Sequence, residues 1–175
     1  MKIKVVRHGE TDLNNPIRRM QGISDYELNA NGIEQAKKIR DILKKEKFDL
    51  IISSPLKRAL QTAKIINECM NISIILDNRI KERDYGNLEG EIFKKEYCNL
   101  DYDFTSVNGE SIENYKMRLN DFIKDIKTRY NNKNILIVAH NGVISVLSCI
   151  LEGEPSDRNF EKRGIKNGEI KEFTI

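Results

Sequence analysis

The chain opens with MKIKVVRHGE, residues 1–10, in which a short apolar run ends in Arg-His-Gly. The pattern returns in ILIVAHNG, residues 135–142, where another apolar run ends in a histidine followed closely by a glycine. These two stretches hold His8 and His140, the only two histidines of the chain. Aliphatic runs of this kind predict strands that are covered on both faces. The matched endings suggest that two strands deliver both histidines to one place.

Outward from these two runs, apolar strand-like segments alternate with helical patterns. Strands are expected over residues 2–6, 50–53, 72–76 and 135–139, and over 170–175 as an antiparallel edge strand after a turn at Asn167-Gly168. The alternation predicts an α/β fold with a largely parallel sheet.

Helical spacing and capping residues predict four helices. The first has Ile33, Ala36, Ile39 and Leu43 on one face, with Asn29 or Asn31 as its cap. The others are expected to begin at Ser54-Pro55, at Ser111 and after Gly142, and the last of them is apolar nearly all round.

Composition indicates one globular domain over residues 1–175. The net charge of +3 is too small to indicate nucleic acid as a partner. The three cysteines are widely spaced and form no CxxC pair. This spacing favours free thiols in a reducing cytoplasm. No segment has the length of apolar sequence that a signal peptide or a membrane span requires, so no membrane partner is expected.

Polar residues follow three of the predicted strands. The first strand delivers Arg7 and His8, the second leads to Arg58, and the fourth delivers His140 and Asn141. Ligands of open parallel sheets bind beyond the carboxyl ends of the strands. Arginine forks and helix N-termini bind oxyanions, so these residues predict a phosphate site.

A neutral histidine beside a bound phosphate can attack the phosphorus and form a phosphohistidine. The leaving oxygen then needs a proton from an acid, and the residues alone leave Glu82, Asp84 and Glu89 open as candidates. A metallohydrolase is disfavoured, because the histidines form no HxH or HExxH pattern and Arg7 would repel a divalent cation. We expect no metal and no cofactor.

At these residues the sequence resembles the histidine phosphatase superfamily, which includes the cofactor-dependent phosphoglycerate mutases. The resemblance runs in order over residues 3–150. The motifs that carry it are RHGET at 7–11, MQGISDYELNANGIEQA at 20–36, SSPLKRALQTA at 53–63, KERDYGNLEG at 81–90, NGESIENYKMRL at 108–119 and ILIVAHNGVI at 135–144. The family implies a three-layer sandwich, with a mostly parallel central sheet and helices on both faces.

The resemblance also implies roles for single residues. His8 would be the phosphorylated nucleophile and Glu82 the proton donor, and His140, the third catalytic residue, would bind the phosphoryl group. Arg7, Arg58 and Asn14 would contact the phosphate.

Four further assignments extend this set. We place Asn141 among the phosphate contacts, and Gly22, Ile23 and Arg83 among the substrate contacts.

Two departures favour a phosphatase over a mutase. Residues 91–108 lack the arginines and prolines that the mutases carry there, and Asp84 stands where mutases tend to have histidine. We therefore expect a phosphomonoesterase of a small phosphorylated metabolite, as a monomer or homodimer. The alternatives are a phosphoglycerate mutase and, from another class, a non-catalytic phosphate-binding protein.

Residues 84–110 lack a clean helical or strand period. They are either a lid that sets specificity, with Tyr97, Tyr102 and Phe104 against the leaving group, or a helical insertion with its own small core.

Overall fold

A five-stranded sheet forms the centre of the protein. The computed structural model describes all 175 residues. The sheet has the order β3-β2-β4-β1-β5, and only the β1–β5 pair is antiparallel. The mostly parallel sheet with one antiparallel edge strand is therefore confirmed. Its strands are β1 (Lys2–Arg7), β2 (Leu50–Ser53), β3 (Ile74–Leu76), β4 (Ile135–Ala139) and β5 (Ile170–Thr174).

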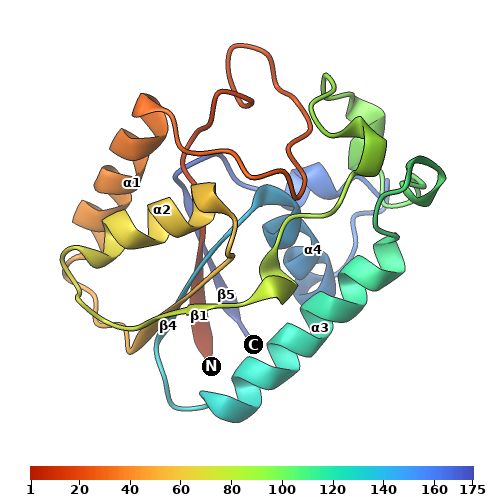
Figure 1. The fold of residues 1–175 in the computed structure, drawn as a ribbon. Helices are drawn as coiled ribbons and strands as arrows, with labels where there is room; N and C mark the ends of the chain where they lie inside the picture. The colour runs from red at the N-terminus through yellow and green to blue at the C-terminus, as the bar shows by residue number, and fades with distance from the viewer.

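Helices cover both faces of the sheet, which confirms the three layers (Figure 1). Two helices, α1 (Ala30–Leu43) and α2 (Lys57–Asn67), pack on one face, and α3 (Ile112–Arg129) and α4 (Asn141–Glu152) pack on the other. Neighbouring residues of β1 show why both layers form. Val5 belongs to the core under α3 and α4, whereas Val6 belongs to the core under α1 and α2.

The helix starts agree with the sequence at α1 and α3 and differ at α2. Asn29 caps α1 by accepting from the Gly32 amide at 2.9 Å, and Ser111 caps α3 in the same way. The prediction of Ser54 as the cap of α2 is wrong, because this helix begins at Lys57. Its first amide is bonded instead by the side chain of Asp25, at 2.6 Å.

Two smaller predictions also fail for local reasons. β3 begins at residue 74 rather than 72, because the Asn67 side chain bonds both the amide and the carbonyl of Ile72. In α1, Ile33 is 38% exposed and faces away from the core, which is reached by Gly32 instead.

Residues 84–110 form short 3₁₀ turns at Gly86–Leu88, Lys95–Cys98 and Thr105–Val107, and single β-bridges at Ile92 and Asn99. A small aromatic core holds them together, made by Met20, Tyr85, Tyr97 and Phe104. The segment therefore has the satellite core that one of the two interpretations expects, built on turns rather than on regular helix.

No helix of the protein combines the length and the apolar character that crossing a membrane requires.

Candidate active site

His8 and His140 lie side by side because their strands are neighbours. β1 and β4 are parallel with Arg7 opposite Ala139, so the residue that follows each strand reaches the same edge of the sheet. The His8 amide donates to the Ala139 carbonyl at 3.0 Å, and the two imidazole rings are 5.2 Å apart. The convergence that the matched sequence endings predict is present.

The imidazole of His8 is held in one tautomer. Its Nδ1 lies 2.7 Å from the Gly9 carbonyl oxygen, which only accepts, so Nδ1 carries the proton and Nε2 has a free lone pair. Burial holds the pKa of His8 well below its usual value, and the charges of Arg58 and Arg7 add to this effect. His8 is therefore a neutral base at physiological pH.

His140 is fully buried beside His8. Its Nε2 lies 2.8 Å from the Ser54 hydroxyl, while its Nδ1 has no partner in the protein. Burial, followed by the charge of Arg58, lowers its pKa well below the usual value. Its side chain lies behind the cavity wall, whereas His8 lines it.

Arg7 and Arg58 bring positive charge to the cavity without a carboxylate partner. Arg7 donates to the Ile165 carbonyl at 2.7 Å, and Arg58 donates to the carbonyls of Ser24 and Gly22, each at 2.7 Å. The Nε–H group of each arginine is buried without a partner. Burial and the nearby Arg18 lower the pKa of Arg7 to about 10, so it stays charged at neutral pH. Two such guanidinium groups favour an anion.

Two asparagines add neutral donors. The Asn14 side-chain oxygen accepts from the Thr11 amide at 3.0 Å, and the Asn141 oxygen accepts from the Ile165 amide at 2.9 Å. In both residues the amide oxygen is thus occupied, and the NH₂ group remains for a ligand in the cavity that they line.

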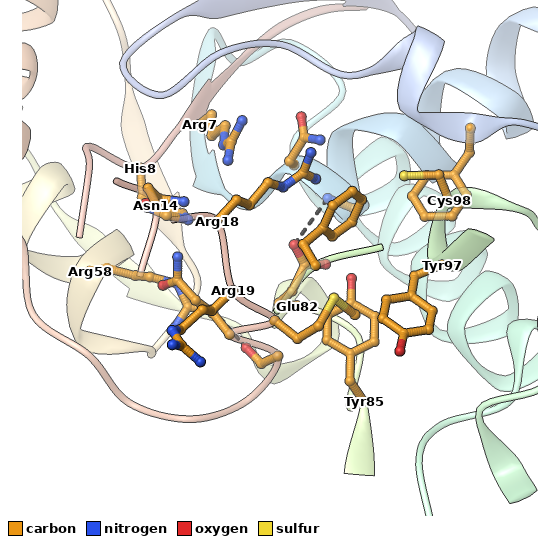
Figure 2. Close-up of a pocket in the computed structure, with 17 residues that line it drawn as sticks. Arg7, His8, Asn14, Arg18, Arg19, Arg58, Glu82, Tyr85, Tyr97 and Cys98 are labelled. Carbon is orange, nitrogen blue, oxygen red and sulfur yellow. Dashed lines mark hydrogen bonds between the residues drawn. The ribbon is translucent and has the colours of Figure 1, made fainter. Parts of the chain in front are cut away.

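Glu82 is the only acidic side chain that lines the cavity. It is 7% exposed and lies in the cavity as Figure 2 shows. One carboxyl oxygen accepts from the Tyr115 hydroxyl at 2.8 Å, and the other accepts from the Gly142 amide at 3.0 Å. A Cβ atom at position 142 would lie 2.2 Å from Glu82 Oε1, so any side chain there would displace the carboxyl group.

The outer part of the cavity is lined by residues that sequence reasoning missed. Arg18 and Arg19 reach it from the loop after Asn14, and aromatic side chains form its wall together with them (Figure 2). The Arg18 guanidinium lies 3.5 Å from the centre of the Phe93 ring and pairs with Glu161, while Arg19 donates to the Gly90 carbonyl at 2.8 Å. The one feature of the sequence that could have indicated these contacts is the pair of adjacent arginines, Arg18 and Arg19.

Some predicted substrate contacts lie elsewhere. Gly22 lines the cavity, but the Ile23 side chain is 43% exposed outside it. Arg83 is turned away, because its Nε–H donates to the Glu110 carbonyl at 2.9 Å and its guanidinium packs over Phe104.

The three aromatics expected at the leaving group divide in a similar way. Only Tyr97 lines the cavity. Phe104 is fully buried in the satellite core, and Tyr102 packs against it with 4.6 Å between ring centres.

The structure contains no candidate metal site. No group of three or more His, Cys, Asp or Glu side chains is arranged to hold a metal ion.

Comparison with known proteins places this site in a family. The family model described as "Histidine phosphatase superfamily (branch 1)" matches residues 3–175. The chain belongs to this superfamily. The sequence of this histidine phosphatase is 41% identical over 155 residues to that of phosphatase PhoE of Bacillus subtilis. The match covers 86% of this chain and 78% of that one.

Two further relatives agree with this membership. Phosphoserine phosphatase 1 of Hydrogenobacter thermophilus is 32% identical, over 87% of this chain and 77% of its own. The solved structure of YhfR from Bacillus stearothermophilus superposes with a TM-score of 0.89 at 25% identity, covering 99% of this chain and 91% of that one. The family and the names of these relatives both identify the protein as a phosphatase.

Proposed function

We propose that this histidine phosphatase hydrolyses monoesters of small phosphorylated metabolites through a phosphohistidine on His8. The observation that carries the proposal is the free Nε2 lone pair of a neutral His8, in a cavity where Arg7 and Arg58 have no carboxylate partner. An incoming phosphate would supply the missing negative charge, and the basic nitrogen would face its phosphorus atom.

The reaction would proceed in two balanced steps. In the first, His8 Nε2 bonds to phosphorus, the ester P–O bond breaks, and the leaving oxygen takes a proton from Glu82. In the second, a water molecule attacks phosphorus, gives a proton back to Glu82, and releases inorganic phosphate with free His8. Arg7 and Arg58 would hold the phosphoryl oxygens throughout, with His140 buried beside His8 and not in contact with the phosphate.

The outer cavity supports a substrate class. Arg19, and Arg18 with its exposed partner Glu161, add two guanidinium groups beyond the pair that a phosphate would neutralise. We infer that the preferred metabolite carries a second anionic group at its far end, between these arginines and the aromatic wall. Residues 84–110 would then act as the specificity segment of a single domain, since Tyr85, Phe93 and Tyr97 come from it.

Hydrolysis is favoured over mutase activity by the position of Arg83. A mutase must retain the second acidic end of its substrate while the phosphoryl group returns to it. Arg83 is engaged with Glu110 and Phe104, so it adds no contact to those of Arg18 and Arg19 at that end.

The three unpaired cysteines, of which Cys98 and Cys149 are buried, support a reducing compartment such as the cytoplasm.

Hydrolysis of p-nitrophenyl phosphate by the wild type and by His8→Ala tests the mechanism. The assay contains EDTA, and Lys64→Ala on the exposed side of α2 serves as the control. We expect His8→Ala to lower kcat/KM by at least about three orders of magnitude, as loss of a nucleophile does. Equal turnover by both proteins would exclude the His8 mechanism. Phosphate binding without turnover by the wild type would indicate the non-catalytic alternative.

A further inference from the structure

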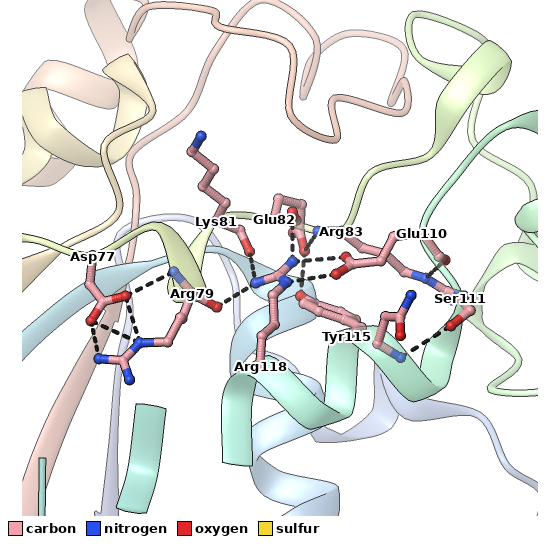
Figure 3. Close-up of polar contacts among 10 residues, drawn as sticks. Asp77, Arg79, Lys81, Glu82, Arg83, Glu110, Ser111, Tyr115 and Arg118 are labelled. Atoms are coloured by element: carbon pink, nitrogen blue, oxygen red, sulfur yellow. Dashed lines mark hydrogen bonds and ion pairs between the residues drawn. The ribbon is translucent and has the colours of Figure 1, made fainter. Parts of the chain in front are cut away.

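The carboxyl group of Glu82 depends on α3 for its position. Glu82 lies in an irregular stretch after the 3₁₀ turn Asn78–Ile80, and neither a helix nor a strand fixes its backbone. Two residues of α3, Tyr115 and Arg118, reach this stretch from the side (Figure 3). They lie three positions apart and therefore share one face of the helix.

Tyr115 contacts the carboxyl group directly. Its hydroxyl donates to Glu82 Oε1 at 2.8 Å, and its ring is buried in the larger core beside Ile80 and Leu119. Burial and the charge of Glu82 raise the pKa of Tyr115 well above its usual value, so the hydroxyl keeps its proton and stays a donor.

Arg118 holds both Tyr115 and the backbone of Glu82. Its guanidinium lies 4.4 Å from the Tyr115 ring centre and donates to the carbonyls of Lys81 at 2.8 Å and Glu82 at 3.1 Å. The same guanidinium donates two hydrogen bonds to the carboxylate of Glu110, at 2.7 and 2.9 Å. Figure 3 shows this chain of contacts running from Glu110 through Arg118 to Tyr115 and Glu82.

The two carboxyl oxygens of Glu82 are not equivalent. Oε1 accepts from the Tyr115 hydroxyl and from the Arg83 amide at 3.0 Å, so both of its lone pairs are used. Oε2 accepts only from the Gly142 amide, which leaves one lone pair for a proton. Glu82 and Gly142 both line the cavity, and the remaining lone pair of Oε2 is the one position on the carboxyl group that is open to a transferable proton.

We propose that Tyr115, braced by Arg118, is a positioning residue that saturates Oε1 of Glu82 and so assigns the transferable proton to Oε2. The proposal rests on the proposed function, in which Glu82 protonates the leaving oxygen. Tyr115 gives up no proton: the bond that breaks is Oε2–H, and the new O–H bond forms on the leaving group.

Tyr115→Phe tests this role with two substrates. It removes one hydroxyl and keeps the packed ring. An alkyl phosphate needs protonation of its leaving oxygen, whereas nitrophenolate leaves without it. For the alkyl phosphate we expect kcat/KM to fall by about tenfold to a hundredfold, as removal of the donor to a buried acceptor does. For p-nitrophenyl phosphate the expected fall is less than about threefold.

Three variants complete the experiment. Tyr130→Phe is the matched control, because Tyr130 follows the same helix and lies outside the cavity. Glu82→Gln should show the same dependence on leaving group with a larger loss. Glu110→Gln loosens the grip on Arg118 without changing Tyr115 or Glu82, and should show the same preference with a smaller loss.

The outcomes separate this inference from the proposed function. An equal loss on both substrates, or no loss, in Tyr115→Phe would overturn the positioning role while a selective Glu82→Gln left the mechanism standing. A Glu82→Gln variant without selectivity would remove Glu82 as the acid, and the inference with it. Should Tyr115→Phe not fold, the selectivity of Glu110→Gln decides in the same way.

Discussion

At the scale of single residues, the two buried histidines couple the stability of the fold to pH. Burial first, and Arg58 next, lower the pKa of both His8 and His140 well below the usual value. In the unfolded chain each histidine binds a proton near its ordinary pKa of about 6.5. Below that pH the unfolded state takes up protons that the folded state refuses, so the free energy of unfolding falls as pH falls.

Urea unfolding between about pH 8 and about pH 5.5 measures this coupling. The contribution is complete above the unfolded pKa and is lost as pH falls from there toward the lower folded pKa. We expect His140→Asn to lose less free energy of unfolding over this range than the wild type, because one of the two proton-binding sites of the unfolded chain is gone. Carboxylates titrate equally in both proteins. Parallel pH profiles of the two proteins would contradict the prediction.

At the scale of elements, Arg18 links three segments at the mouth of the cavity. It lies in the loop after Asn14, stacks on Phe93 of the 84–110 segment, and pairs with Glu161 of the 3₁₀ helix Phe160–Arg163. An exposed pair of this kind contributes little to stability, so a substrate anion can replace Glu161 at low cost. The loop and the segment thus form one boundary of the outer cavity.

Arg18→Gln tests whether that boundary selects anionic metabolites. We expect KM to rise by about fivefold or more for phosphomonoesters with a carboxylate at the far end, the loss of roughly one charged contact. For p-nitrophenyl phosphate, KM should stay unchanged. Arg129→Gln, at the exposed end of α3, is the matched control. A uniform rise in KM on both substrates would place Arg18 at the phosphate instead.

Strand ends were predictable from the sequence, whereas the contacts that cross between elements were not. The apolar runs predicted β1 and β4, and with them the positions of His8 and His140. A strand that is buried on both faces consists of consecutive apolar residues, which can be recognised locally. Glu82 came from the family resemblance alone, since its partner Tyr115 is thirty-three positions away and an irregular stretch has no period.

Local competition between hydrogen bonds explains the misplaced element ends. A serine before a proline signals a helix cap. At Ser54 that signal failed because the hydroxyl is bonded to His140, and α2 begins later. At β3, the Asn67 side chain competes for the backbone of Ile72.

At the scale of the whole molecule, one core on each face of the sheet supports the site. Leu43 of α1 is fully buried on one face, while its neighbour Ile42 is 61% exposed. We expect Leu43→Ala to lower the free energy of unfolding by about 2–5 kcal/mol, and Ile42→Ala to change it by less than about 0.5 kcal/mol. Urea denaturation measures both, and similar losses in the two variants would contradict the packing described.

The segment between α4 and β5 packs against the residues of the site. After α4 the chain returns along the reactive edge, where the Ile165 backbone bonds both Arg7 and Asn141 and the Asn167 side chain donates to the His8 carbonyl at 3.1 Å. It then enters β5 beside β1. Residues from the start, middle and end of the sequence therefore meet at one candidate site.

Chemical trapping of the phosphorylated enzyme tests the central claim most directly. Glu82→Gln, mixed with radiolabelled p-nitrophenyl phosphate and quenched in alkali, should accumulate label, because the leaving group departs unaided while hydrolysis of the intermediate lacks its base. We predict alkali-stable, acid-labile label on His8 and none in the His8→Ala double variant. Label that survives acid, or that persists without His8, would contradict the phosphohistidine mechanism.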